Sequence, residues 1–181
     1  MRAREVTAKR YAKALYMAAR EAGAAGAVGE ELERFVEAVT TNAQARDVLS
    51  RPWIKADDRR AIAVSLADKI GAGRVVQNFA GLIAERGRVD HLPEIVAAYR
   101  ALLDEELGQA RATVRSAVPL AEGDRQRLGQ RLERVLGKRV ILDEQVDPTL
   151  LGGFVAQVGG YILDGSLDGQ LARLRERLVR G

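Results

Sequence analysis

The chain has no cysteine, and aromatic residues make up only 4% of its 181 residues. Without cysteine it can form neither a disulfide nor a thiolate metal site, so a reducing compartment is permitted but not required. With so few aromatic residues, the core must consist mainly of Ala, Val, Leu and Ile. This suits closely packed helices better than a large β-sandwich.

Long hydrophobic runs are also missing. No segment approaches the roughly 20 apolar residues that cross a bilayer, and the first residues contain no apolar core of signal-peptide length. We therefore expect a soluble chain that reaches a membrane only through its partners.

The charge is weakly basic and evenly spread. The formal net charge is +4; residues 1–105 carry 17 basic and 15 acidic side chains, and residues 106–181 carry 12 and 10, which is +2 in each part. No block of Lys and Arg stands clear of acids, and no aromatic side chains alternate with the arginines as a single-strand binder would need. Nucleic-acid binding is therefore disfavoured.

Residue patterns that are typical of catalytic sites are scarce in this sequence. His91 is the only histidine, which excludes histidine clusters for metals. The glycine pairs 152–153 and 159–160 lack the spacing and the lysine of a phosphate-binding loop. Asp164 and Asp168 flank a turn, where capping fits them better than acid–base work. The sequence predicts no enzyme and no cofactor, metal or nucleotide site.

The first hundred residues predict five to six amphipathic helices in a bundle, because apolar residues recur every three or four positions. A first helix is expected from about Thr7 to Ala22, and a short one, capped by Asn42, ends before Pro52. Trp53 is expected to anchor the next turn, although an exposed position is open. The expected apolar faces are Tyr11, Ala14, Leu15 and Ala18; Val28, Leu32, Phe35, Val36 and Val39; Ile62, Leu66 and Ile70; and Val75, Val76, Phe79, Leu82 and Ile83.

From residue 108 the hydrophobic period changes to two, which predicts a small α+β domain. A half-buried strand (110–118), a helix (about 128–136) and a second strand (140–146) precede a hairpin of residues 154–158 and 161–163. Ser166 can cap a last helix. The expected apolar residues of the two helices are Leu128, Leu132, Val135 and Leu136, and then Leu167, Leu171, Leu174 and Leu178. We place the domain boundary between residues 105 and 106, giving a helical bundle over 1–105 and an α+β domain over 106–181.

Three segments carry a family resemblance. The longest comprises Asp147, Leu150, Gly152, Gly153, the run Ile-Leu-Asp-Gly-Ser at 162–166, Gly169, Leu171, Leu174 and Arg175. Residues 10–15 and 78–88 match in the same order along the chain. In these segments the sequence resembles the delta subunit of the bacterial and chloroplast F-type ATP synthase, the counterpart of the mitochondrial oligomycin-sensitivity-conferring protein.

The resemblance implies a stator protein that transforms no substrate. In that family the N-terminal bundle caps the catalytic head and grips an amphipathic N-terminal segment of an alpha subunit. The C-terminal domain holds b-type subunits of the peripheral stalk. Small residues of the first and fifth helices, such as Ala18 and Gly81, could leave a groove for the segment. The residues expected to bind alpha are Tyr11, Ala14, Leu15, Val76, Phe79, Leu82 and Ile83, and those expected to bind the stalk are Arg173, Arg177 and Arg180.

Alternatives remain open at this point. The apolar residues of the first and fifth helices could simply be internal core. The chain could also be a stand-alone helical adaptor for one amphipathic peptide or, less favoured, a basic nucleic-acid-binding module. The resemblance implies a part of the ATP synthase complex with no nucleotide bound directly, and the lack of a transit-like leader favours the cytoplasmic face of a bacterial cell membrane over an organelle.

Overall fold

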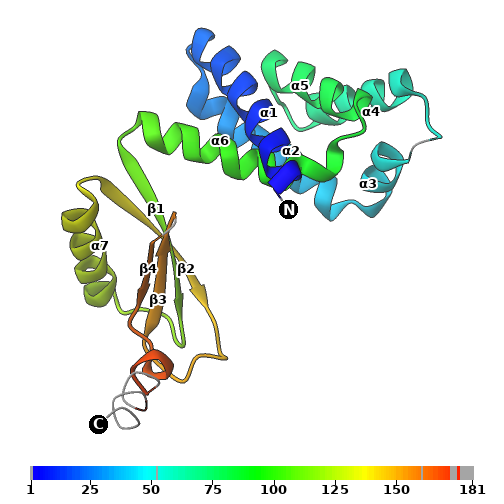
Figure 1. The fold of residues 1–181 in the computed structure, drawn as a ribbon. Helices are drawn as coiled ribbons and strands as arrows, with labels where there is room; N and C mark the ends of the chain where they lie inside the picture. The colour runs from blue at the N-terminus through cyan, green and yellow to red at the C-terminus, as the bar shows by residue number, and fades with distance from the viewer. Residues whose placement is uncertain (1, 52, 160, 172–174, 176–181) are drawn as a thin grey trace. The chain divides into compact units, whose positions relative to one another are not determined.

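A computed structural model describes residues 2–51, 53–159, 161–171 and 175. The chain separates into two compact units, Met1–Leu103 and Asp104–Gly181, which we call the N-terminal and the C-terminal unit. The first is helical and the second combines a sheet with a long helix (Figure 1). The predicted fold class, a helical bundle followed by a small α+β domain, is confirmed.

The helices of the N-terminal unit form one core. Their bounds are α1 (Arg2–Glu21), α2 (Ala25–Thr41), α3 (Ala43–Ser50), α4 (Ala56–Lys69), α5 (Arg74–Glu85), the 3-10 turn η1 (Val89–His91) and α6 (Leu92–Glu106), whose last turn belongs to the C-terminal unit. The largest fully buried side chains include Tyr99, Phe35 and Leu32. The bundle is therefore built from aliphatic side chains around a few aromatic rings.

Helix α1 differs from its expected form. It begins at Arg2, five residues before the predicted start, and its buried face consists of Ala8, Ala12, Leu15, Tyr16 and Ala19. Ala14 and Ala18, which were expected on the same face, are exposed, and Tyr11 is half-buried. At about 100° per residue, the buried positions lie within about 50° of the direction of Ala12 and Ala19, whereas Ala14 and Ala18 point more than about 90° away from it.

Helix α2 confirms its predicted apolar face. Val28, Leu32, Phe35 and Val39 are at most 3% exposed. Gly29 lets α6 approach, since a Cβ there would lie 3.2 Å from Cε1 of Tyr99. The Tyr99 hydroxyl donates a hydrogen bond to the Ala25 carbonyl at 2.8 Å. Close packing, this hydrogen bond and the ion pair between Arg100 and Glu33 thus join α2 to α6.

The connection from α3 to α4 confirms one prediction and corrects another. The Asn42 side chain accepts a hydrogen bond from the Ala45 N–H at 3.1 Å, as a cap for α3. Trp53, expected to anchor the turn, is 74% exposed. Its ring contacts the Arg51 guanidinium, whose Cζ lies 5.4 Å from the ring centroid. The indole therefore stacks on a surface cation and anchors nothing in the core.

Helix α4 buries alanines in place of the expected isoleucine. Ala63 and Ala67 are fully buried, whereas Ile62 is 39% exposed. Helix α5 approaches closely at Gly81, where an added Cβ would lie 3.0 Å from Cγ2 of Val64. Such a separation leaves room only for small side chains along the contact line.

The C-terminal unit is a four-stranded sheet with helix α7 along one face (Figure 1). Strand β1 (Gln109–Ser116) pairs in parallel with β2 (Arg139–Val146), and α7 (Glu122–Leu136) connects them. Strand β3 (Phe154–Val158) pairs antiparallel with both β1 and β4 (Tyr161–Asp164), so the order is β2-β1-β3-β4. The predicted order of elements and the predicted hairpin are confirmed.

The residues around the hairpin build turns. Gly153 has φ +78°, and Gly165 N–H donates to the Phe154 carbonyl at 2.9 Å. Asp164 accepts from the Ser166 N–H, and Ser166 Oγ accepts from the Gly169 N–H at 3.0 Å, which caps the helix described over residues 167–171. The resemblance segment is therefore a set of turn and capping contacts.

The core of the C-terminal unit is small. Its buried hydrophobic residues are Ala112, Val114, Leu128, Leu132 and Ala156. Four side chains expected on apolar faces are exposed instead: Val118 at 68%, Val135 at 78%, Leu167 at 47% and Leu171 at 57%. Val118 lies beyond the end of β1, and α7 turns Val135 away from the strands it covers. Leu174 and Leu178 lie outside the described residues.

Candidate partner-binding surfaces

The residues expected to bind an alpha subunit gather on α1 and α5, at different depths. Leu15, Val76, Phe79 and Ile83 are at most 7% exposed; Tyr11 is half-buried; Ala14 is exposed and Leu82 is 38% exposed. Tyr11 and Phe79 meet edge to face with ring centroids 6.5 Å apart, which links the two helices. The buried members support this face from below, and the exposed ones are directly accessible.

One exposed apolar residue of α1 was not among those expected from the sequence. Met17 is 55% exposed and lies three positions after Ala14 on α1. Residues three and four apart share a side of a helix, so Ala14, Met17 and Ala18 form one exposed strip. A flexible thioether adapts to varied apolar partners. The helical spacing was visible in the sequence, but only the packing shows that this strip is exposed.

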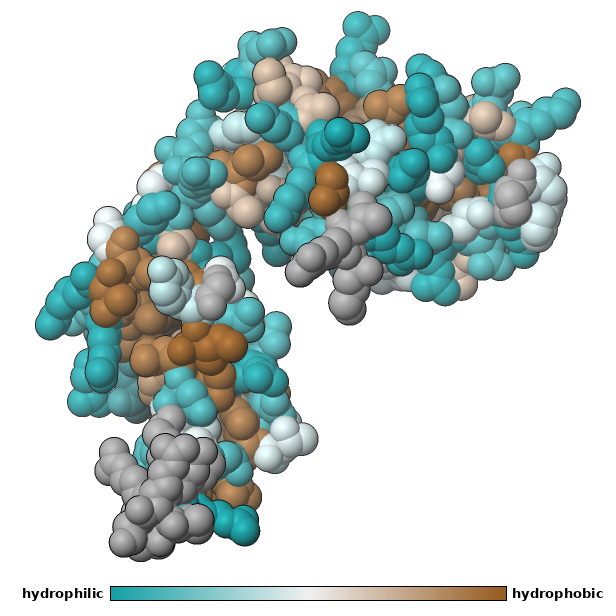
Figure 2. All heavy atoms as spheres, in the orientation of Figure 1, coloured by the Kyte–Doolittle hydropathy of each residue, from teal (hydrophilic) through white to brown (hydrophobic). Residues whose placement is uncertain are grey.

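The arginines expected to bind the stalk, Arg173, Arg177 and Arg180, lie outside the described residues. The C-terminal unit nevertheless presents a large apolar surface (Figure 2). Its exposed large hydrophobic residues are Leu107, Val118, Val135, Val146, Leu151, Tyr161, Ile162, Leu163, Leu167 and Leu171. Exposed apolar patches of this kind mark binding surfaces in soluble proteins.

Part of this surface is an apolar groove between α7 and the β3–β4 hairpin, with a volume of about 570 Å³. Helix α7 contributes Arg131, Leu132, Val135 and Leu136; the strands contribute Ala156, Val158, Tyr161, Ile162 and Leu163. Among these residues the exposed fraction runs from 1% for Ala156 to 78% for Val135. The groove thus has a buried floor and open, apolar walls.

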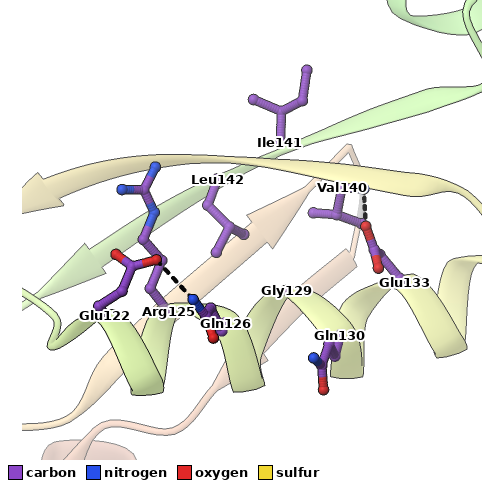
Figure 3. Close-up of a pocket in the computed structure, with 9 residues that line it drawn as sticks. All are labelled: Glu122, Arg125, Gln126, Gly129, Gln130, Glu133, Val140, Ile141 and Leu142. Atoms are coloured by element: carbon purple, nitrogen blue, oxygen red, sulfur yellow. Dashed lines mark hydrogen bonds between the residues drawn. The ribbon is translucent and has the colours of Figure 1, made fainter.

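The opposite side of α7 has a different character. A depression of about 530 Å³ between α7 and β2 has walls that include Glu122, Arg125, Gln126, Gln130 and Glu133 (Figure 3). Gln126 donates to the Glu122 carboxylate at 3.1 Å, and Glu133 accepts from the Val140 N–H at 3.1 Å. Gln126, Glu122 and Glu133 are therefore hydrogen-bonded within the unit, and this polar side resembles ordinary solvated surface.

An ion-pair cluster ties the end of α6 to the sheet. Asp104, only 8% exposed, accepts from Arg111 at 3.2 Å, and Arg111 also contacts Asp143 on β2 at 3.4 Å. The hydrogen bond to Asp104 is the main cause that raises the pKa of the Arg111 guanidinium above its usual value. Arg111 thereby stays charged and neutralises a nearly buried carboxylate.

A second acidic residue stabilises the loop after β2. Asp147 accepts from the Thr149 hydroxyl at 2.6 Å and from the Thr149 N–H at 3.0 Å. These hydrogen bonds, the hydroxyl contact foremost, hold the pKa of Asp147 below its ordinary value. The carboxylates of Asp104, Asp143 and Asp147 therefore all have partners within the fold.

The described residues contain no cluster of three or more His, Asp or Glu side chains placed to hold a metal ion. No helix in the described part of the chain is long and apolar enough to cross a membrane. Each of the two units has exposed apolar residues that a partner could cover. This arrangement is typical of the class of proteins that connect other proteins.

Comparison with known proteins identifies the family. Residues 7–178 match the family described as "ATP synthase delta (OSCP) subunit". The ATP synthase subunit delta of Syntrophobacter fumaroxidans is 37% identical over 176 residues, covering 97% of this chain and 96% of the relative. That of Anaeromyxobacter sp. (strain Fw109-5) is 43% identical over 171 residues, covering 94% and 96%. The chain belongs to the ATP synthase delta (OSCP) subunit family.

A solved structure shares the fold. A chain in the Toxoplasma gondii mitochondrial ATP synthase hexamer superposes with a TM-score of 0.74 at 18% identity, covering 95% of this chain and 97% of that chain. Family membership makes the chain a stator subunit of the peripheral stalk of an ATP synthase, structural and not itself catalytic. Its partners lie within that membrane-associated complex.

Proposed function

We propose that the N-terminal unit binds the amphipathic N-terminal helix of an alpha subunit on the α1/α5 face, and that the C-terminal unit binds the b-type stalk subunits. The chain then bridges the catalytic head to the stalk at the cytoplasmic face of the bacterial membrane. Because the rotor exerts torque on the head, this bridge keeps the head from turning and keeps proton flow coupled to ATP synthesis.

One observation carries the proposal: in a member of a stator family, each unit has its own exposed apolar surface. Met17 and Leu82 are exposed on the first unit, and Val135 and Tyr161 on the second. A single-peptide adaptor needs one such surface, whereas a bridge needs two.

The α1/α5 face has the chemistry that suits an amphipathic helix. Ala14 and Ala18 on α1 are small and let a partner backbone approach, and Leu82 and Met17 supply exposed apolar area. A helix laid on such a face contributes anchors at i, i+3, i+4 and i+7. Each large apolar side chain buried in this way contributes about 1.5–3 kcal/mol.

Substituting Leu82→Asp tests this contact more cleanly than changing Phe79, which is 7% exposed and belongs to the core. A synthetic peptide of the alpha N-terminal residues from the same organism should bind the variant about 2 kcal/mol more weakly by calorimetry, because a charge would enter an apolar contact. Ile62→Asp on α4 is the matched control, since Ile62 is 39% exposed against 38% for Leu82. Equal affinities for the two variants would place the peptide elsewhere.

Purification of the chain from its native membranes tests the bridge as a whole. Alpha and b-type subunits should travel with it. Two contacts of nanomolar quality correspond to about 12 kcal/mol each, and their linkage in one assembly makes the attachment tighter than either alone. Recovery of nucleic acid or an unrelated peptide-bearing protein, without those subunits, would overturn the proposal.

A further inference from the structure

Helix α7 covers only half of the sheet. As the crossover between the parallel strands β1 and β2, it lies on their side of one face. The order β2-β1-β3-β4 leaves β3 and β4 beyond it. Strands are spaced about 4.8 Å apart and a helix with its side chains is about 10 Å wide, so one helix cannot cover four strands.

Strands β3 and β4 are apolar on the face that α7 occupies. Ala156 is buried with Leu132 of α7, which fixes the orientation of β3. The pairings Ala156–Leu163 and Val158–Tyr161 place Leu163 and Tyr161 on that same face. They form the groove with Val135, which is 78% exposed. The open width beside α7 matches one additional helix at the usual spacing of about 10 Å.

The α7 side of this groove is basic. Arg131 lines it, and Arg127 and Arg134 lie four positions before and three positions after on the same side of the helix. Arg127 is paired with Asp124 at 2.8 Å. Arg131 and Arg134 have no ion-pair partner among the described residues. These two cations are therefore available to acidic side chains of an occupant.

We infer that the groove between α7 and the β3–β4 hairpin is the seat of one stalk helix, which has an apolar stripe on Val135, Tyr161 and Leu163 and an acidic flank against Arg131 and Arg134. This inference rests on the proposed function, because the occupant is a segment of the b-type stalk. It assigns the docking surface to described residues in place of the terminal arginines. The added helix completes the second layer of the sheet.

Binding of the soluble part of the b-type subunits to the full chain tests the assignment. Val135→Asp should lower the affinity roughly tenfold or more, because it buries a charge in the contact. Val118→Asp is the matched control: Val118 is 68% exposed in the same unit and does not line the groove. Circular dichroism and thermal unfolding establish that both variants fold.

A charge reversal tests the acidic flank independently. Arg131→Glu should weaken binding several-fold and reduce its dependence on salt. Arg125→Glu on the β2 side of the same helix should leave affinity and salt dependence unchanged. If wild-type binds the stalk and all four variants bind equally well, the groove is overturned while the proposed function stands. If wild-type does not bind the stalk subunits, the proposed function itself fails.

Two other occupants give distinct results. A wild-type dimer in light scattering that Val135→Asp makes monomeric would assign the groove to a second copy of this chain. Loss of hydrogen-exchange protection on β4 of the free chain after removal of residues 172–181 would assign it to the chain's own end. Either result would overturn the inference.

Discussion

The two units distribute their apolar side chains in opposite ways. Among the described residues, the core of the N-terminal unit contains 22 buried hydrophobic residues and that of the C-terminal unit contains five. The exposed large hydrophobic residues number five in the first unit and ten in the second. The first unit buries its apolar surface internally, whereas the second leaves much of it for partners.

This difference indicates how each unit is stabilised. Hydrophobic burial is the main favourable term in folding, so a unit with few buried residues gains more of its stability by binding partners. The N-terminal unit resembles a finished domain with a binding face. The C-terminal unit resembles a domain that is completed in the assembly.

Core truncations should expose the contrast most strongly. Leu32→Ala, at a fully buried position of α2, should lower the free energy of unfolding of the N-terminal unit by about 2–5 kcal/mol. Leu132→Ala in α7 should have an effect at or below the lower end of that range, because the cavity would open into the groove. Urea unfolding, with hydrogen exchange as the probe for each unit separately, measures the loss of unfolding free energy in both variants. Equal losses would contradict the contrast.

The next largest loss of stability is expected when one of two glycines of the C-terminal unit is replaced. Gly153→Ala should cost about 3 kcal/mol, because φ is +78° and a Cβ would collide with the Gly165 carbonyl oxygen. Gly159→Ala should cost only about 1 kcal/mol, because φ is +56° but the space around it is open. The same urea experiment measures the pair. A larger loss for Gly159→Ala would place the close approach elsewhere.

Local signals explain what the sequence could predict. The apolar face of α2 and the β3–β4 hairpin depend on spacing and turn residues within one or two elements. Asn42 and Ser166 each cap the helix that follows them, through a hydrogen bond to an N–H three residues further along the chain. These features were confirmed because the physics that produces them acts over short stretches of chain.

Features that depend on distant packing could not be predicted. The choice between Ile62 and Ala63 as a core residue depends on the close approach of α5 at Gly81. The exposure of Val135 depends on the strand order, because α7 lies over β1 and β2 and leaves the β4 side of the same face open. The hydrophobic period cannot give that order. For this reason the groove, the main candidate for stalk binding, was missed.

The ion-pair cluster should have a moderate effect. Arg111→Gln would leave Asp104, which is 8% exposed, without its charged partner. We expect a loss of about 1–2 kcal/mol in the stability of the C-terminal unit, in the lower part of the usual range because Arg111 is one-third exposed. The double variant with Asp104→Asn should recover part of it. Additive losses in this double-mutant cycle would show that the two side chains act independently.

The smallest effect concerns pH. Because hydrogen bonds from Thr149 lower the pKa of Asp147 in the folded chain, the unfolded chain takes up the proton more readily as the solution is acidified. The contribution of Asp147 is therefore complete above its ordinary pKa of about 4 and is lost as the pH falls through the lowered value. Asp147→Asn removes this ionisation, so the C-terminal unit of the variant should lose less stability than wild-type between neutral and acidic pH. Urea unfolding of the two proteins at a series of pH values measures the difference, and parallel curves would show that Asp147 ionises equally in the folded and unfolded chain.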